Sequence, residues 1–313
     1  MKQNCCSPAP SAFAGSTIEM EAIEVRESAA DLTGMARIPG GAFYMGTNSA
    51  IAYPADGEGP KRSVEVDEFW IDRTAVTNLA FSEFVRATGY ETEAEREGWS
   101  FLPQHLVTGV GDKYFFGISP NTPWWVGVKQ TNWRSPLGPG SSISELLNHP
   151  VVHISWNDAD AFAQWQGKRL PSEAEWEKAA RGGVENSHFP WGDELMPDGY
   201  FRSNLWQGDF PEFNSGADGY LGTAPVNAFE PNGYGLYNVS GNVWEWCSDW
   251  WSNNLHKKNE KEKVIKGGSF MCHESYCNRY RLSARSFNLP NSFAAHIGFR
   301  CATDNKRELL TSD

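Results

Sequence analysis

The sequence is poor in three features, each of which would have pointed to a particular class of protein. It has only six cysteines in 313 residues, too few for a fold held together by disulfide bonds. No apolar run approaches the roughly 20 residues that a membrane-spanning helix needs. The net charge of −12 lacks the basic excess that nucleic-acid binding requires. We therefore expect no membrane span and no nucleic-acid partner.

The N-terminal residues also lack the apolar stretch of a secretory signal peptide. Residues 1–33 carry Ser, Ala, Pro and acidic side chains without periodicity, so we expect a flexible arm that includes Cys5 and Cys6. Without an export signal, we expect a cytoplasmic location, where thiols stay reduced. That environment favours a working thiol pair over a structural disulfide.

The chain is rich in aromatic and turn-forming residues. Its 14 Trp and 40% hydrophobic content supply a core, whereas 30 Gly and 18 Pro predict much loop. Residues 37–46 are typical of a strand, a Gly-Gly turn and a second strand, and residues 63–67 alternate like a half-buried strand. Residues 150–156 predict a short buried strand. In the aromatic stretch between residues 89 and 149, the pattern predicts little regular structure.

Three helices can be predicted from their start signals. Thr77 can cap a helix whose apolar residues repeat at helical spacing. A second helix is expected over residues 157–166. Ser172 and Glu175 form a capping-box pattern for the third, which should end at the following Gly-Gly pair.

Reactive side chains gather between Gly267 and Tyr280, where Cys272 and Cys277 lie five positions apart. On a straight strand their Cα atoms would be roughly 17 Å apart, with side chains on opposite faces. On a helix they would be separated by about 140° around the axis. Because a disulfide needs Cα atoms within roughly 7 Å, and a shared metal needs similar closeness, the chain must bend here if the thiols act together. The two glycines that open the segment suit a close backbone approach.

The residues alone leave more than one chemistry open for this pair. Structural zinc could use Cys272, His273 and Cys277, but it needs four ligands, and Cys247 and Cys301 are isolated. A dithiol–disulfide redox switch is a second interpretation, although the spacing departs from Cys-x-x-Cys. Two thiolates also suit Cu(I), whose low coordination number leaves room for a substrate thiol. Nothing in the pattern chooses between the second and the third.

Five segments resemble the sulfatase-modifying-factor superfamily. Four are shared with members of other function: Arg169–Glu177, Asn232–Asn238, Gly241–Trp246 and Gly298–Cys301. The fifth, residues 267–281 with Ala284–Ser286, is narrower and strongly resembles the formylglycine-generating enzymes of this superfamily. The resemblance covers about Met35 to Ala302 and looks like a bacterial-type cytosolic form.

This resemblance implies a single α+β domain over residues 34–303, with much irregular loop and a C-type-lectin-like fold. The flanking residues would be the N-terminal arm, 1–33, and a C-terminal tail, 304–313. It also implies an oxidoreductase that uses O2 and Cu(I) to convert a cysteine into Cα-formylglycine. The substrate would be a Cys-x-Pro-x-Arg segment of an unfolded sulfatase polypeptide. We expect the protein to act as a monomer.

The same resemblance assigns the site residues. Cys272 and Cys277 would hold the copper, and the substrate thiolate would join them as a third sulfur. The reacting centre would be lined by Ser269, Tyr276 and Arg279, with Trp244 close by. Arg279 could stabilise developing negative charge.

Two structural calcium sites are implied as well. The first would use Asn204, the Leu205 carbonyl, Asp218 and the Tyr220 carbonyl. The second would use Asn238, the Gly241 and Val243 carbonyls and Glu245. Hard oxygen ligands and turn-forming glycines fit calcium, which would fix loops that regular structure does not.

Two rival functions belong to other classes. A non-catalytic superfamily module could bind peptide or carbohydrate through an aromatic surface, and such a module need not contain the thiol pair. A non-haem iron sulfoxide synthase would need a histidine cluster, whereas the histidines here, among them His105, His149, His153 and His188, form none in the sequence. For His153 we expect a hydrogen-bonded core histidine.

Overall fold

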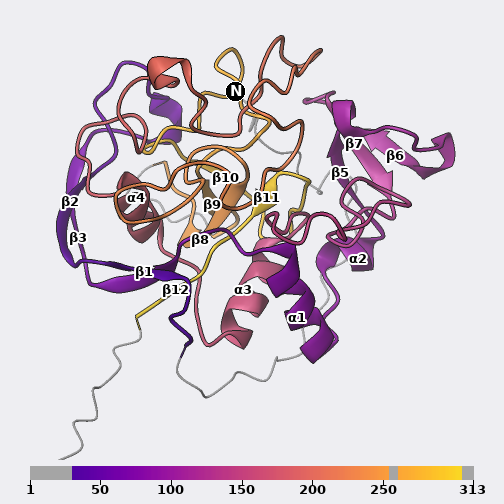
Figure 1. The fold of residues 1–313 in the computed structure, drawn as a ribbon, viewed down its shortest axis with the longest axis horizontal. Helices are drawn as coiled ribbons and strands as arrows, with labels where there is room; N and C mark the ends of the chain where they lie inside the picture. Colours follow the sequence, from indigo (N-terminus) through magenta and orange to yellow (C-terminus); the bar gives the residue numbers. More distant parts are fainter. Residues whose placement is uncertain (1–29, 254–259, 305–313) are drawn as a thin grey trace, which may run out of the picture.

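The computed structural model describes residues 30–253 and 260–304. The predicted arm and tail, including Cys5 and Cys6, lie almost wholly outside these residues. Within the described chain, four α-helices and many short strands are joined by long irregular segments (Figure 1). This is the predicted mixture of helix, strand and abundant loop.

Three of the four sheets lie around the outside of this arrangement. One is antiparallel, in the order β1 (Met35–Ile38), β4 (Phe69–Asp72) and β12 (Ala302–Thr303). A second pairs β2 (Gly41–Met45) with β3 (Arg62–Val66). The third, at the right of Figure 1, has the order β5 (Trp99–Pro103), β7 (Trp125–Lys129) and β6 (Phe115–Ile118).

The fourth sheet lies in the middle of the molecule and carries the thiol segment (Figure 1). Its order is β10 (Ser286–Asn288), β9 (Lys263–Lys266), β8 (Trp244–Trp250) and β11 (Ile297–Gly298). β11 runs parallel to β8, and the other two pairings are antiparallel. Because β9 runs directly into Gly267, this sheet sets where the thiol segment begins.

The structure confirms the three predicted helices and the residues that were expected to cap two of them. α1 (Asn78–Thr88) is capped by the Thr77 side chain, and α4 (Glu173–Arg181) has the Ser172–Glu175 capping box. α3 (Trp156–Trp165) starts after Ser155, one residue earlier than expected, and packs against α1. The short α2 (Glu93–Glu97) was not expected.

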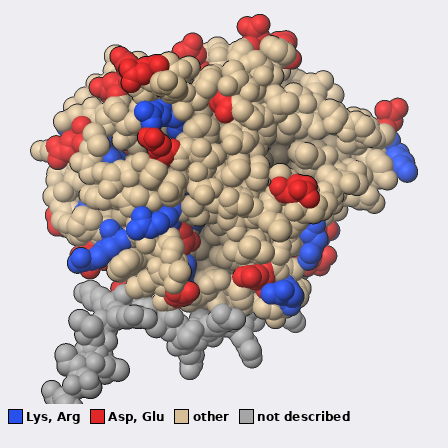
Figure 2. Space-filling model, in the orientation of Figure 1, with Lys and Arg blue, Asp and Glu red and all other residues tan. Residues whose placement is uncertain are grey.

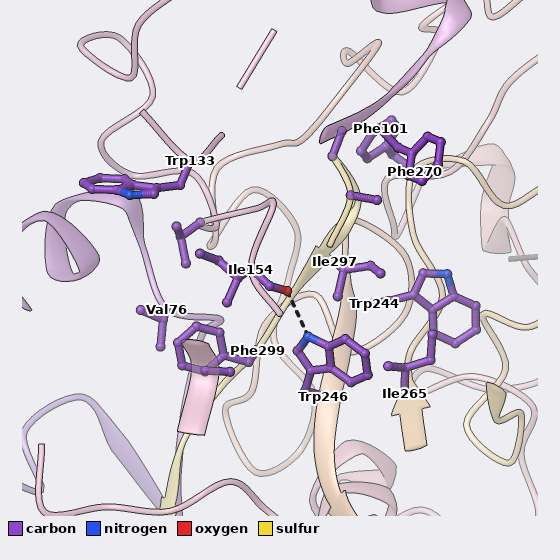
Figure 3. Close-up of a cluster of buried hydrophobic side chains, with 14 of the residues drawn as sticks. Val76, Phe101, Trp133, Ile154, Trp244, Trp246, Ile265, Phe270, Ile297 and Phe299 are labelled. Carbon is purple, nitrogen blue, oxygen red and sulfur yellow. Dashed lines mark hydrogen bonds between the residues drawn. The ribbon is translucent and has the colours of Figure 1, made fainter. Parts of the chain in front are cut away.

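Large aromatic side chains fill the core between the central sheet and these helices. Figure 3 shows Trp244 beside Ile265 and Ile297, and Trp246 on the same strand. Trp246 donates its indole N–H to the carbonyl of Ile154 at 3.0 Å. Trp244 and Trp246 of β8 are fully buried, whereas Trp250 at the end of the strand is exposed, so the first part of β8 is anchored in this core.

Two predictions for the middle of the chain are wrong. Residues 150–155 are buried but form no strand, because His153 has a φ of 62° and the backbone amides donate to different segments, and Trp156 already begins α3. The amide of Val151 donates to Val76, and that of His153 donates to Ala294. The stretch 89–149 is more regular than predicted, since it contains α2 and the β5–β7–β6 sheet.

Side-chain hydrogen bonds order the long loop segment between α4 and β8. Asn242 is an example: its Oδ1 accepts from the Ala224 amide at 2.8 Å, and its Nδ2 donates to the Ala224 carbonyl at 3.2 Å. Charged side chains on the face in Figure 2 stand singly or in small groups, separated by uncharged surface. Among the described residues, no helix combines the length and the apolar character that a membrane span needs.

Candidate active site

The thiol segment leaves β9 through Gly267 and Gly268. Both have a backbone conformation that only glycine adopts at little energetic cost. Gly267 and Gly268 have φ values of 92° and 74°. A Cβ on Gly268 would lie 2.8 Å from the Cβ of Tyr280 and 2.9 Å from its Cα. The glycine therefore allows residues 268 and 280 to meet backbone to backbone, which closes the segment between them into a loop.

This loop brings the two predicted thiols together. The Sγ atoms of Cys272 and Cys277 lie 3.2 Å apart, and each residue is only 2% exposed. That distance is well beyond the roughly 2.05 Å of a disulfide bond. The Cys272 amide donates to the Ser269 carbonyl at 2.8 Å, and the Cys277 amide donates to the His273 carbonyl at 2.7 Å. Two consecutive turns thus replace the strand or helix that would have kept the sulfurs apart.

Ser269 and Tyr276 both lie at this loop. The Ser269 amide donates to the Cys272 sulfur at 3.4 Å, and the buried Ser269 hydroxyl accepts from the Met271 amide at 3.3 Å. The Tyr276 ring stacks on Phe210 with centroids 4.6 Å apart and meets the edge of Trp124 at 4.6 Å. Ser269 therefore contacts the thiol site directly, whereas Tyr276 joins it to an aromatic cluster from distant loops.

The other two predicted site residues are placed differently. Trp244 is fully buried in the same core cluster as Cys272, and its indole N–H has no hydrogen-bond partner among the described residues. Arg279 donates from Nε to Asp56 at 2.6 Å, and its guanidinium lies 4.3 Å above the ring of Tyr53. The Asp56 carboxylate already balances the charge of Arg279. A role for Arg279 in stabilising negative charge during the reaction therefore stays a prediction.

A cavity of about 290 Å³ opens beside Cys272. It is lined partly by apolar side chains and partly by His273, Glu274 and Gln207. The Trp206 amide donates to the Cys272 carbonyl at 3.1 Å, which ties the cavity wall to the thiol loop. Burial and the nearby Cys272 raise the pKa of the Tyr280 hydroxyl that also lines it. The cavity can admit a side chain or short peptide segment to Cys272.

The residues of the first predicted calcium site lie together. Asp218 accepts from the Leu205 amide at 3.0 Å and from the Tyr220 amide at 3.1 Å. The Oδ1 atom of Asn204 is buried without a hydrogen-bond partner in the described chain. A buried oxygen without a donor is costly unless a cation or water satisfies it. The donor set therefore fits a calcium ion, whose presence stays a prediction.

In the second predicted calcium site, fewer ligand oxygens are available to bind an ion. Asn238 also has a buried Oδ1 with no partner among the described residues, and Gly241 has a φ of 80°. Glu245, however, accepts two hydrogen bonds from Arg300, at 2.6 and 2.7 Å, and one from Trp176 at 2.7 Å. Val243, whose carbonyl was expected to bind the ion, is itself buried. The charged ligand of this set is therefore largely occupied.

Other candidate metal ligands are dispersed. In residues 30–253 and 260–304, no group of three or more His, Cys, Asp or Glu side chains is arranged to hold a metal. Burial raises the pKa of the Cys247 and Cys301 thiols well above the ordinary value, and they lie apart from the pair. His153 is a core histidine, as predicted, bonded to Ser100 at 2.7 Å and to the Pro136 carbonyl at 2.9 Å. Two sulfurs alone offer the low coordination number that Cu(I) accepts.

Sequence reasoning missed a set of residues that contacts the thiol segment from far away in the chain. Tyr53, Asp56 and Glu58 bond to residues 278–283, which follow Cys277 directly. More than 220 positions separate the partners, so no local spacing links them. The only signal was indirect: three arginines soon after the thiols require carboxylates from elsewhere if they are buried.

One protein family and several curated relatives match most of this chain. A family described as "Sulfatase-modifying factor enzyme 1-like domain" matches residues 21–305. A Formylglycine-generating enzyme from Thermomonospora curvata is 57% identical over 284 residues, covering 87% of this chain and 93% of the relative. A Mus musculus protein of the same name is 52% identical, covering 88% of this chain and 76% of the relative. An "Inactive C-alpha-formylglycine-generating enzyme 2" from Bos taurus is 46% identical, with coverages of 86% and 87%.

Solved structures support the fold alone. PvdO from Pseudomonas aeruginosa aligns with a TM-score of 0.60 at 24% identity, covering 86% of this chain and 93% of that one. The Treponema denticola variable protein 1 aligns with a TM-score of 0.54 at 20% identity, covering 87% and 95%. These similarities confirm the predicted α+β, C-type-lectin-like architecture.

Proposed function

This chain belongs to the sulfatase-modifying factor enzyme 1-like family, and we propose that it oxidises a cysteine of a sulfatase polypeptide to Cα-formylglycine. The observation that carries the proposal is the pair of buried sulfurs, 3.2 Å apart, beside an open cavity. Family membership alone would not suffice, because a relative with 46% identity is named as inactive.

The proposed cofactor is Cu(I), held by Cys272 and Cys277. Two sulfur donors in contact, in a mostly apolar setting, match the preference of this soft ion. When bound, copper would supply a redox centre accessible to O2 and to a third thiolate. Calcium is proposed as a structural ion at Asn204, Leu205, Asp218 and Tyr220, with weaker support at Asn238, Gly241, Val243 and Glu245.

The protein's own groups have separable tasks in this proposal. The Ser269 amide, at 3.4 Å, stabilises negative charge on the Cys272 sulfur. Tyr276, which precedes Cys277 in the chain, and the buried Trp244 would add aromatic surface that keeps bulk water from the reacting sulfur. The cavity of about 290 Å³ is too small for a folded domain. The substrate cysteine would therefore have to be presented on an extended, unfolded segment, for which we propose Cys-x-Pro-x-Arg.

The overall conversion balances with one external reductant. The substrate thiol and O2, together with two electrons and two protons, give the aldehyde, hydrogen sulfide and water. The C–S bond breaks, the Cβ–H proton is lost, and the aldehyde oxygen is added at Cβ. A thiol reductant of the kind present in the cytoplasm would supply the electron pair, and it would also keep Cys272 and Cys277 reduced. We propose that the monomer carries out this reaction.

The experiment that tests the proposal incubates the purified protein with a Cys-x-Pro-x-Arg peptide, O2 and a thiol reductant, with and without added Cu(I). Mass spectrometry should detect loss of sulfur and gain of the aldehyde, with turnover stimulated by Cu(I). A protein that binds the peptide but never yields aldehyde, with or without the metal, would favour the non-catalytic module instead.

A further inference from the structure

A polar interface joins residues 53–58, called the clamp below, to residues 278–285 just after Cys277. The clamp includes one turn of 3-10 helix, Pro54–Asp56, which ends at Gly57 with a φ of 70°. It comes from the loop between β2 and β3, far from the thiol segment in sequence. Its side chains nevertheless reach the backbone and the arginines that follow the second thiol.

The strongest link is a fully buried ion pair. Arg281 donates from Nη1 and Nη2 to the two carboxylate oxygens of Glu58, at 2.6 and 2.7 Å, and both side chains are 0% exposed. The Tyr53 amide donates to the same carboxylate at 3.0 Å, which holds Glu58 in place. In a bidentate pair, both guanidinium nitrogens must align with both carboxylate oxygens. This requirement fixes the position of Arg281 relative to the clamp.

A second link lies closer to the thiols. Asp56 accepts from Arg279 Nε at 2.6 Å, in a pair that is 15% and 11% exposed. The Tyr53 hydroxyl accepts from the Asn278 amide at 3.3 Å, and the Tyr53 ring lies under the Arg279 guanidinium. The clamp therefore holds the two residues that follow Cys277 by one backbone contact and one ion pair.

These contacts bear on the distance between the sulfurs. Cys272 is held by the Ser269 turn, within its own side of the loop. On the other side, the chain leaves Cys277 directly into the residues that the clamp holds. We propose that Asp56, acting through Arg279, and Glu58, acting through Arg281, are positioning residues that keep Cys277 against Cys272. Loss of either contact leaves the Cys277 amide bonded to the His273 carbonyl at 2.7 Å but lets the second thiol move further from the first.

The test measures thiol proximity in the metal-free, full-length protein, in which Cys5 and Cys6 are replaced by serine in every variant because they form a second adjacent thiol pair. Phenylarsine oxide, a trivalent arsenical, bridges two thiols that lie close together and binds a separated pair far more weakly. Asp56→Asn keeps the side chain's size but removes its charge. We expect it to weaken arsenical binding by roughly ten- to a hundred-fold, as removal of partners that orient metal ligands does. Peptide turnover should fall in parallel at an unchanged peptide KM.

Two further variants separate positioning from general destabilisation. Glu68→Gln removes the carboxylate of an exposed ion pair with Arg37, 46% and 62% exposed, outside the clamp. It should leave arsenical binding and turnover unchanged. The charge-swapped double variant Asp56→Arg with Arg279→Asp should recover most of the arsenical affinity that Asp56→Asn loses.

Two results would overturn the inference. One is wild-type arsenical affinity in Asp56→Asn, whatever happens to its melting temperature. The other is failure of the charge swap to recover affinity in a protein that melts like Asp56→Asn. If Asp56→Asn does not fold, Tyr53→Phe replaces it, since it removes only the acceptor of the Asn278 amide, and the same criterion applies.

The inference rests on the proposed function only for its turnover readout. Arsenical binding reports the thiol geometry even if the wild-type protein forms no aldehyde. Weakened binding in Asp56→Asn with an inactive wild type would sustain the clamp and reject the oxidase. An active wild type with unaltered arsenical binding in the variant would support the oxidase and reject the clamp.

Discussion

Arg300 and Glu245 form a buried bidentate ion pair at the centre of the molecule, with Nε and Nη2 of the arginine donating at 2.6 and 2.7 Å. Trp176 adds a third hydrogen bond to the same carboxylate. Because a carboxylate accepts along about four directions, Glu245 has about one left for a metal ion. Asp218 accepts from backbone amides, with no ion pair to a described residue. The two predicted calcium sites should therefore differ in strength.

Removing calcium should test this difference. We expect a calcium chelator to lower the melting temperature, and Asp218→Asn to remove most of the calcium-dependent stabilisation. With free calcium about 100-fold above its dissociation constant, that stabilisation is ~2.7 kcal/mol. Asn238→Ala, in the second site, should retain most of it. Calorimetry with and without chelator measures the effect, and identical melting curves under both conditions would count against structural calcium. Copper stoichiometry should not change.

Replacing either thiol of the pair should abolish aldehyde formation. Cys272→Ser and Cys277→Ser each remove one sulfur from the proposed copper site but change the volume little, so the fold should survive. Turnover of the Cys-x-Pro-x-Arg peptide is followed by mass spectrometry, and folding by melting temperature. Cys301→Ala is the matched control, because Cys301 is equally buried but lies apart from the pair. Near-normal turnover in either serine variant would show that the assignment is wrong.

The sequence predicted those features of the fold whose signals are local. Thr77 and the Ser172–Glu175 pair lie within a few residues of the helices that they cap, so their patterns were sufficient. Residues 150–156 have the composition of a buried strand, yet the left-handed backbone at His153 breaks any regular pairing. Histidine adopts a positive φ more often than most residues, but it does so too rarely for the sequence to predict it here. The His153 ring is held by Ser100 and the Pro136 carbonyl, which come from elsewhere in the chain.

The same limit applies to the site. Ser269, Cys272 and Cys277 lie within nine residues, so a single motif could carry all three. Asp56 and Glu58 reach the site only through the fold, and their acidic side chains resemble those of any loop. The pairing of Arg279 with Asp56 could not be foreseen, because 223 positions separate the two residues.

A methyl group at Gly268 should damage the thiol loop more than the same change elsewhere. Gly268→Ala would place Cβ within 2.8–3.1 Å of the Cβ, Cα and amide nitrogen of Tyr280. Gly89→Ala is the control, with a similar φ of 71° but no atom within 4 Å. The control should lose about 1–2 kcal/mol from backbone strain. Gly268→Ala should lose roughly 1–3 kcal/mol more from the clash, along with peptide turnover. Equal losses in urea unfolding of the two variants would contradict the predicted backbone contact.

The buried His153 should contribute a loss of stability in mild acid, whereas the buried Asp158, whose pKa burial raises to about 7, acts in the opposite sense. Complete burial lowers the pKa of this imidazole from 6.5 to about 4. Between these values the unfolded chain takes up a proton that the folded protein does not, so unfolding is favoured as the pH falls. The stabilisation is fully present above about pH 6.5 and is lost progressively down to about pH 4. Its size is about 3 kcal/mol at most, from the difference between the two pKa values.

Urea unfolding at several pH values measures this loss, and His153→Gln isolates it. Glutamine keeps a neutral amide that can donate to the Pro136 carbonyl, the acceptor that the imidazole Nε2 reaches at 2.9 Å. Its free energy of unfolding should be lower at neutral pH, because the contact with Ser100 is altered, but should fall less steeply between about pH 6.5 and 4. His188 is the comparison, since its side chain is 28% exposed beside Asp193 and His188→Gln leaves the buried imidazole in place. That variant should therefore keep the wild-type slope in this window. If the slope is unchanged in His153→Gln instead, another group takes up the proton and the neutral, buried imidazole is not its cause.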